Sequence, residues 1–265
     1  MPIIPSLAIR LLLAAALSTC GTGIALAQAQ PQPESKQPSK SPPTKDRTIV
    51  RTVISDSEAE RQAMGSQFRD ALGLAQADVE AQRLEQAIAR LAPVTEYCDR
   101  LLTSGRALVS VATASEYQSY MAARQDSEPV DWVDMSCPRS YNILGFIAVE
   151  TRGFEKALAY LDKAVNLAPL WADPRVEHGF VLNQLHRNRE ALADYRLALE
   201  LVERYPSNAA MKAIAQRGLG YTFVELGDLD AAERAYQDSL VEEPGNAIAQ
   251  NELEYIRQRR GAANH

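Results

Sequence analysis

The sequence predicts an all-α fold in which the C-terminal half consists of stacked, antiparallel helix pairs. Three glycines, Gly145, Gly179 and Gly220, each precede an alanine by twelve residues, and another small residue follows each alanine seven positions later. The glycines are 34 and then 41 residues apart, so the second interval contains seven extra residues. Recurrence at this period is typical of stacked supersecondary units, in which small residues at fixed positions let paired helices approach closely.

The N-terminal residues predict export. Arg10 is the only charged residue among the first 27, an apolar run follows it, and Ala25-Leu26-Ala27 has the small-x-small form that signal peptidase accepts. We therefore expect a signal peptide at residues 1–27 and a periplasmic or secreted mature chain. Cleavage after Ala27 or after Ala29 fits the sequence.

Cys20 leaves a second interpretation of this segment open. Leu17-Ser18-Thr19-Cys20 is similar to a lipobox, in which Cys20 would be lipidated and would anchor the protein to a membrane. Threonine departs from the residue that usually precedes such a cysteine. An uncleaved membrane anchor is disfavoured, because Gly21-Thr22-Gly23 interrupts a segment that is already short for a bilayer.

The next residues predict a linker and then a helical cap. Residues 28–47 are rich in Gln, Pro, Ser and Lys and contain no large apolar side chain, so we expect a disordered linker. Residues 48–54 are mostly β-branched, which favours one short strand. Residues 48–137 as a whole are expected to form a helical N-terminal cap on the repeats.

Four helical segments are expected within this cap. The first runs from Ser55 or Asp56 to Gln76, and the second from Asp78 to the residue before Pro93, because proline usually ends a helix. Further helical turns are expected at residues 94–102 and 106–124. Residues 126–137 form an acidic connector whose carboxylates lack the spacing of a calcium-binding loop.

Two cysteines, Cys98 and Cys137, remain if Cys20 leaves with the signal peptide. An even number of cysteines in an exported chain favours a disulfide bond. Two unpaired cysteines in the core are the alternative.

The repeated pattern resembles that of the tetratricopeptide repeat (TPR) family, which is W-x2-L-G-x2-Y, then A-x3-F, then P. The first unit has Tyr141, Leu144, Gly145 and Ala148, then Ala157, Leu161, Ala164 and Pro169; the second has Arg175, His178, Gly179 and Leu182, then Ala191, Tyr195 and Ala198; the third has Gln216, Leu219, Gly220 and Phe223, then Ala232, Tyr236, Ser239 and Pro244. Arg175 and His178 depart from the family's apolar positions. We expect a TPR domain at residues 138–260, with repeats at about 138–171, 172–206 and 213–246 and a capping helix at 246–260.

The resemblance implies a right-handed superhelix whose concave groove binds a peptide or protein segment. The first helix of each pair lines that groove in the family, which implies a set of partner-binding residues: Asn142, Phe146, Val149, Phe180, Asn183, Gln184, Arg217, Tyr221 and Val224. Phe146, Phe180 and Tyr221 each follow a repeat glycine directly and would form an aromatic row. The alternative is that these rings pack against the N-terminal helices or the C-terminal cap. These positions include no lysine, which disfavours the TPR type that grips acidic tails.

Other chemistry is not indicated by the sequence. His178 and His186 have no cysteine or carboxylate at metal-ligand spacing, and the motifs of common hydrolases and nucleotide-binding proteins are missing. We therefore expect no metal, no cofactor and no enzymatic activity. A formal net charge of −6 without a basic run disfavours nucleic acid as a partner.

These expectations combine into an exported adaptor or scaffold of the bacterial cell envelope, with a protein or peptide as its partner. One alternative is a lipid-anchored factor that assists envelope assembly. Another is a structural repeat protein that associates with itself.

Overall fold

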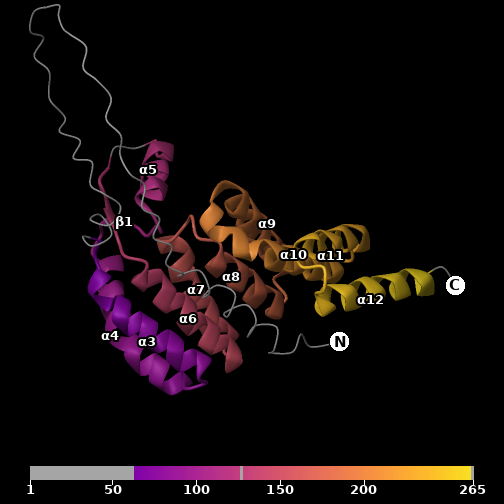
Figure 1. The fold of residues 1–265 in the computed structure, drawn as a ribbon, viewed down its shortest axis with the longest axis horizontal. Coiled ribbons are helices and arrows are strands. Elements are labelled where there is room, and N and C mark those ends of the chain that lie inside the picture. Colours follow the sequence, from indigo (N-terminus) through magenta and orange to yellow (C-terminus); the bar gives the residue numbers. More distant parts are fainter. Residues whose placement is uncertain (1–62, 126–127, 264–265) are drawn as a thin grey trace, which may run out of the picture.

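The computed structural model describes residues 63–125 and 128–263 of the chain. Figure 1 shows helices that follow one another along the longest axis, from α3 and α4 at one end to α12 at the other. The predicted all-α fold is confirmed. The signal peptide, the lipidation at Cys20, the linker at 28–47 and the strand at 48–54 lie outside the described residues.

The N-terminal part, residues 63–135, contains helices and two short strands. Its elements are η1 (Ser66–Phe68), α3 (Arg69–Glu80), α4 (Leu84–Leu102), β1 (Ala107–Val109), α5 (Ala114–Ala123) and β2 (Val130–Trp132). Helices α3 and α4 form a pair that packs on α6 (Ser136–Glu150), the first helix of the repeats. The predicted break between Gln76 and Asp78 is wrong, because Asp78 lies inside α3 and the turn follows at residues 81–83.

Helix α4 runs through Pro93, so the prediction that a helix ends before this residue is wrong. A proline inside a helix costs about 3 kcal/mol. Burial of apolar side chains opposes this cost, because Leu91, Val94 and Cys98 lie on one face of α4 and are buried on both sides of the proline. Full burial of one such aliphatic side chain contributes about 1.5–3 kcal/mol. Burial of this continuous face therefore outweighs the local preference of Pro93.

The expectation of helix throughout residues 106–124 is also partly wrong, because strand β1 precedes α5. Strands β1 and β2 pair in parallel, with Leu108 opposite Asp131, and Met64 forms a parallel bridge with Val133. The β-branched residue Val109 is fully buried in this small sheet, which suits its preference for extended backbone. The sheet therefore holds three distant segments of the N-terminal part together.

The repeat region consists of three helix pairs and a final helix. The pairs are α6 with α7 (Phe154–Leu167), α8 (Asp173–Gln184) with α9 (Asn188–Arg204), and α10 (Lys212–Leu226) with α11 (Leu229–Glu242); α12 (Ala247–Ala263) packs on α11. The first helices of neighbouring pairs contact one another, α6 with α8 and α8 with α10. They therefore form one continuous layer of the molecule (Figure 1).

Two glycines of α10 face aromatic rings of the second helices. A Cβ atom added at Gly220 would lie 2.8 Å from the ring of Tyr236, and one added at Gly218 would lie 2.2 Å from the ring of Tyr195. Neither ring could remain in place beside such an atom. The repeat glycine Gly220 thus leaves room for the ring of Tyr236. Gly218, which the repeated pattern did not reveal, leaves room for the ring of Tyr195.

The long interval between the second and third repeat glycines has a structural counterpart. Between α9 and α10 the chain forms a 3-10 helix, η2 (Pro206–Met211). Asn208 in this segment is buried, its Nδ2 donates a hydrogen bond to the carbonyl oxygen of Leu170 at 2.9 Å, and its Oδ1 accepts one from the N–H of Ala172 at 3.0 Å. The extra residues therefore bind back to the turn between α7 and α8.

Candidate protein-interaction surface

The predicted aromatic row is only partly at the surface. Phe146 is 3% exposed and belongs to the hydrophobic cluster that contains Leu72 of α3 and Leu91 of α4. Its place in the row is therefore wrong, because α3 and α4 cover the first repeat. Phe180 and Tyr221, which occupy the same position in the next two repeats, are half-buried.

Three further residues assigned to the groove are interior packing residues. Val149, Asn183 and Val224 are buried, so their assignment to a partner-binding surface is wrong. The amide Nδ2 of Asn183 donates a hydrogen bond to Oγ1 of Thr222 at 2.9 Å, which links α8 to α10. A buried amide with a partner on the adjacent helix stabilises the stack of repeats.

The other predicted residues keep some exposure. Arg217 forms an ion pair with Glu243, with 2.8 Å between Nη1 and Oε2, so its charge is already used within the chain. Asn142 and Gln184 are half-buried, and Oδ1 of Asn142 has no hydrogen-bond partner in the described structure.

Two carboxylates, Glu225 and Glu252, lie close enough to Tyr221 to affect its hydroxyl. Burial raises the pKa of the Tyr221 hydroxyl, and the negative charges of Glu225 and Glu252 raise it further. Glu225 follows Tyr221 by one helical turn on α10, and Glu252 comes from α12. We name the surface formed by Phe180, Gln184, Tyr221, Glu225 and Glu252 the first-helix face.

Two more carboxylates, Glu177 and Asp173, lie on α8. Glu177 is 6% exposed, and its Oε2 has no hydrogen-bond partner in the described part of the chain. Burial, and then the negative charge of Asp173, raise the pKa of Glu177 to about 7. Burial also raises the pKa of Asp173 to about 6, although nearby Arg139 opposes this shift. Glu177 lies one turn before Phe180, and that spacing could have revealed it.

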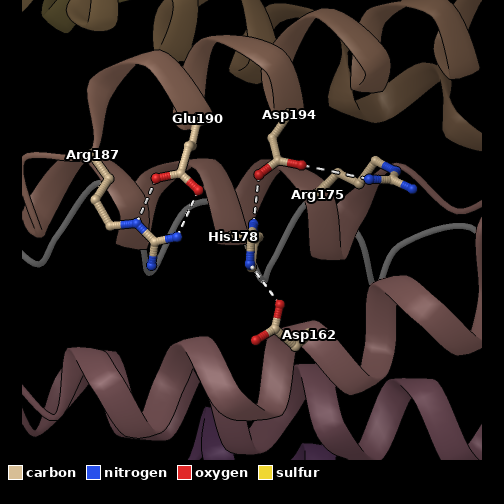
Figure 2. Close-up of polar contacts among 6 residues, drawn as sticks. All are labelled: Asp162, Arg175, His178, Arg187, Glu190 and Asp194. Atoms are coloured by element: carbon tan, nitrogen blue, oxygen red, sulfur yellow. Dashed lines mark hydrogen bonds and ion pairs between the residues drawn. The ribbon is translucent and has the colours of Figure 1, made fainter.

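Arg175 and His178, which depart from the family pattern, belong to a polar network between helices (Figure 2). Nδ1 of His178 lies 2.5 Å from Oδ2 of Asp194 on α9, and Nε2 lies 3.2 Å from Oδ1 of Asp162 on α7. Nη1 of Arg175 lies 3.5 Å from the other oxygen of Asp194. Asp194 and Asp162 thus provide acidic partners for the two residues that depart from the family pattern. Each aspartate is 16 residues from His178.

This network favours the charged form of the imidazole. Burial lowers the pKa of His178, but the hydrogen bond and the charge of Asp194, together with Asp162, outweigh burial and raise the pKa above its ordinary value of 6.5. A protonated His178 donates from both ring nitrogens and links three helices at once. We interpret the network as a structural link within the stack.

Cys98 and Cys137 lie in disulfide-bonding geometry, with 5.7 Å between their Cα atoms and 1.97 Å between their sulfurs. A bond there would join α4 to the start of α6. The oxidised state of this pair stays a prediction.

Across residues 63–125 and 128–263, no group of three or more His, Cys, Asp or Glu side chains could hold a metal ion. No helix within these ranges combines the length and the apolar character that a transmembrane span requires.

The fold and its surface define a class, the helical repeat solenoids built from antiparallel helix pairs. Two family models described as "Tetratricopeptide repeat" match residues 138–169 and 172–240. Residues 138–169 and 172–240 are therefore tetratricopeptide repeats, as the repeated glycines and alanines predict. No curated protein matches it.

Solved structures resemble the chain at low sequence identity. A crystal structure of MamA protein is 16% identical, with a TM-score of 0.49, and the match covers 75% of this chain and 85% of that chain. The first TPR domain of Spaghetti (RPAP3) bound to the HSP90 peptide SRMEEVD is 22% identical, with a TM-score of 0.43 and coverage of 47% and 93%. The Sgt2 TPR domain from Aspergillus fumigatus is 19% identical, with a TM-score of 0.43 and coverage of 48% and 81%.

Proposed function

We propose that this protein is an adaptor or scaffold that binds a protein or peptide segment at its first-helix face. The observation that carries the proposal is the position of Phe180 and Tyr221. They directly follow the glycines of two adjacent repeats, and both rings keep partial exposure while the equivalent Phe146 is buried. Aromatic side chains at a partly exposed surface supply much of the contact energy in protein recognition.

The proposed place of action is the bacterial cell envelope. The support is the sequence of residues 1–27, which has the charge, apolar run and cleavage site of a secretory signal. Lipidation at Cys20 is the alternative form of the same export hypothesis. Acyl labelling of the wild type but not of a Cys20→Ala variant would favour the lipid-anchored form, whereas release of the unlabelled protein by osmotic shock would favour a periplasmic one.

The binding proposal can be tested by photo-crosslinking in living cells. A photoreactive amino acid placed at Gln184, on the face, is expected to yield protein adducts that disappear when Phe180→Ala and Tyr221→Ala are combined. The matched control places the same amino acid at Leu74, which is 52% exposed on α3 and lies outside the face. Equal adducts from both positions, or adducts unaffected by the double variant, would contradict the proposal. Adducts of the chain with itself would favour the self-associating alternative.

A further inference from the structure

Three carboxylates on or beside the first-helix face have no basic partner. Glu225 and Glu252 lie beside Tyr221, and Glu177 lies on the neighbouring helix. None of these three carboxylates forms an ion pair or a hydrogen bond with a lysine or arginine among the described residues. By contrast, Glu243 is paired with Arg217, and Glu242 is paired with Lys212.

Two buried tyrosines, Tyr195 and Tyr236, lie between these carboxylates. The hydroxyl of Tyr195 lies within electrostatic reach of both Glu177 and Tyr221, and the hydroxyl of Tyr236 is within reach of Glu252 and Tyr221. These two tyrosines project from the second helices between the first helices, where Gly218 and Gly220 make room for their rings. The carboxylates of α8, α10 and α12 are therefore near Tyr221 or near a tyrosine that is itself near Tyr221.

Glu177 provides an observation that does not depend on the acidic cluster itself. More than nine-tenths of this residue is buried, yet its Oε2 has no partner in the described structure. A buried carboxylate without a partner is costly, and a cation that approaches it relieves that cost. Glu252, on α12, is half-buried, and burial and the charge of Glu225 raise its pKa.

The chain itself shows how a cation can be held at this row of rings. Tyr255 lies 34 residues after Tyr221, which is one repeat further along, and is 39% exposed. The guanidinium of Arg259 lies over its ring, 5.8 Å from the centroid. Among the described residues, no such cation covers Tyr221 or Phe180, so a positively charged group of a partner can take the equivalent place there.

From these observations, and resting on the proposed function, we propose that the first-helix face binds a protein segment that presents lysine or arginine side chains. The cation of the segment lies between Glu225 and Glu252, over the ring of Tyr221. A second cation of the same segment approaches Glu177 beside Phe180. A segment with an acidic tail is excluded by repulsion from the same carboxylates.

The test compares peptides that differ only in charge. The probe is a fluorescent peptide that repeats the triplet Lys-Leu-Ala, and the matched peptides repeat Gln-Leu-Ala and Glu-Leu-Ala. Fluorescence anisotropy with the purified mature chain is expected to show the lysine peptide binding at least about tenfold more tightly than the glutamine peptide, and the glutamate peptide more weakly than both. Added salt should weaken the binding of the lysine peptide selectively.

Variants test whether the lysine peptide binds at the first-helix face. Glu225→Gln combined with Glu252→Gln is expected to weaken the lysine peptide about tenfold or more and to leave the glutamine peptide unchanged. Glu200→Gln on α9 is the matched control, because Glu200 is exposed and lies outside the face. Circular dichroism and the urea midpoint establish that each variant is folded. Glutamine has the size of glutamate and is neutral, so the substitution should not disturb packing.

The outcomes separate this inference from the proposed function. Equal binding of the lysine and glutamine peptides, including no binding of either, overturns the preference for a cationic segment. An effect of Glu200→Gln as large as that of the double variant overturns the location. Neither result affects the crosslinking from Gln184, which tests whether the face binds protein at all.

Discussion

The N-terminal part and the repeat region are held together in different ways. In the N-terminal part, buried aspartates pair with arginines: Asp78 pairs with Arg83 and Arg90 on the adjacent turn and helix, and Asp134 pairs with Arg69 across 65 residues. In the repeats, the recurring contact is an aromatic or aliphatic side chain seated against a glycine. The comparison teaches that one recurring residue spacing can specify the packing of a repeat, whereas the packing of the N-terminal part depends on particular residue pairs.

The predicted disulfide should have the largest effect, and it would join the N-terminal part to the first repeat. Its loss in a Cys98→Ala, Cys137→Ala double variant is expected to lower the free energy of unfolding by about 4 kcal/mol, because the bond closes a loop of about 40 residues in the unfolded chain. Urea unfolding of the oxidised wild type and of the variant measures this difference. Thiol labelling under denaturing conditions is the control, and two free thiols in the purified mature protein would show that the bond does not form.

Replacement of glycine by alanine should have the next largest effect on the free energy of unfolding, with opposite signs in the two regions. Gly218→Ala is expected to destabilise the repeats by about 1–3 kcal/mol, because the new methyl group collides with the ring of Tyr195. Gly73→Ala in α3 meets no atom within 4 Å and should stabilise that helix by up to about 1 kcal/mol, since alanine favours helix. Differences in urea midpoint test both. A stabilising Gly218→Ala would mean that Tyr195 can move aside.

The smallest effect is a difference in pH dependence between the regions. Hydrogen bonds from Arg90 and Arg83 lower the pKa of Asp78, so the stability that its charge contributes is lost as the pH falls below the ordinary value of 3.8. The pKa of His178 is raised, so its contribution is complete below the ordinary value of 6.5 and is lost as the pH rises through the raised pKa. The two regions should therefore lose these contributions at opposite ends of the pH scale.

Two variants measure this difference. The gap in urea midpoint between the wild type and His178→Leu should shrink from about pH 6 to about pH 9, whereas the gap between the wild type and Asp78→Asn should shrink as the pH falls below about 4. Leucine is the residue that the family pattern places at the position of His178. A constant gap in the first series would show that the network with Asp194 does not depend on the charge of the imidazole.

The sequence was most informative where one local rule repeats. The spacing from Gly145 to Ala157 and its two later copies predicted the fold class, because each copy states the same packing requirement. The helix continues through Pro93, contrary to the prediction, because burial of a face that only the assembled helices define outweighs the local preference of proline. Strand β1 has only three residues, too few for a periodic signal.

The candidate site was harder to predict for a related reason. Phe146, Phe180 and Tyr221 are equivalent in the sequence, but Phe146 lies in the first repeat, where α3 and α4 cover it. Equivalent positions therefore differ in exposure at the end of a stack. The aspartates that partner His178 could not be chosen from sequence, because the packing of α7 and α9 around α8 decides which acids reach the ring. Tyr255 could have been found, since it follows Tyr221 at the repeat interval.

The buried side chain of Asn208 makes the second repeat a part that cannot be exchanged. Repeat proteins are often treated as modules that can be duplicated, deleted or replaced by a consensus unit. Here a consensus unit in that place would remove η2 and leave the N–H of Ala172 and the carbonyl oxygen of Leu170 without their partner. The side-chain amide of Asn208, which belongs to no repeat pattern, thus ties the second repeat to the turn before it. A redesign of this solenoid should therefore keep residues 170–211 together.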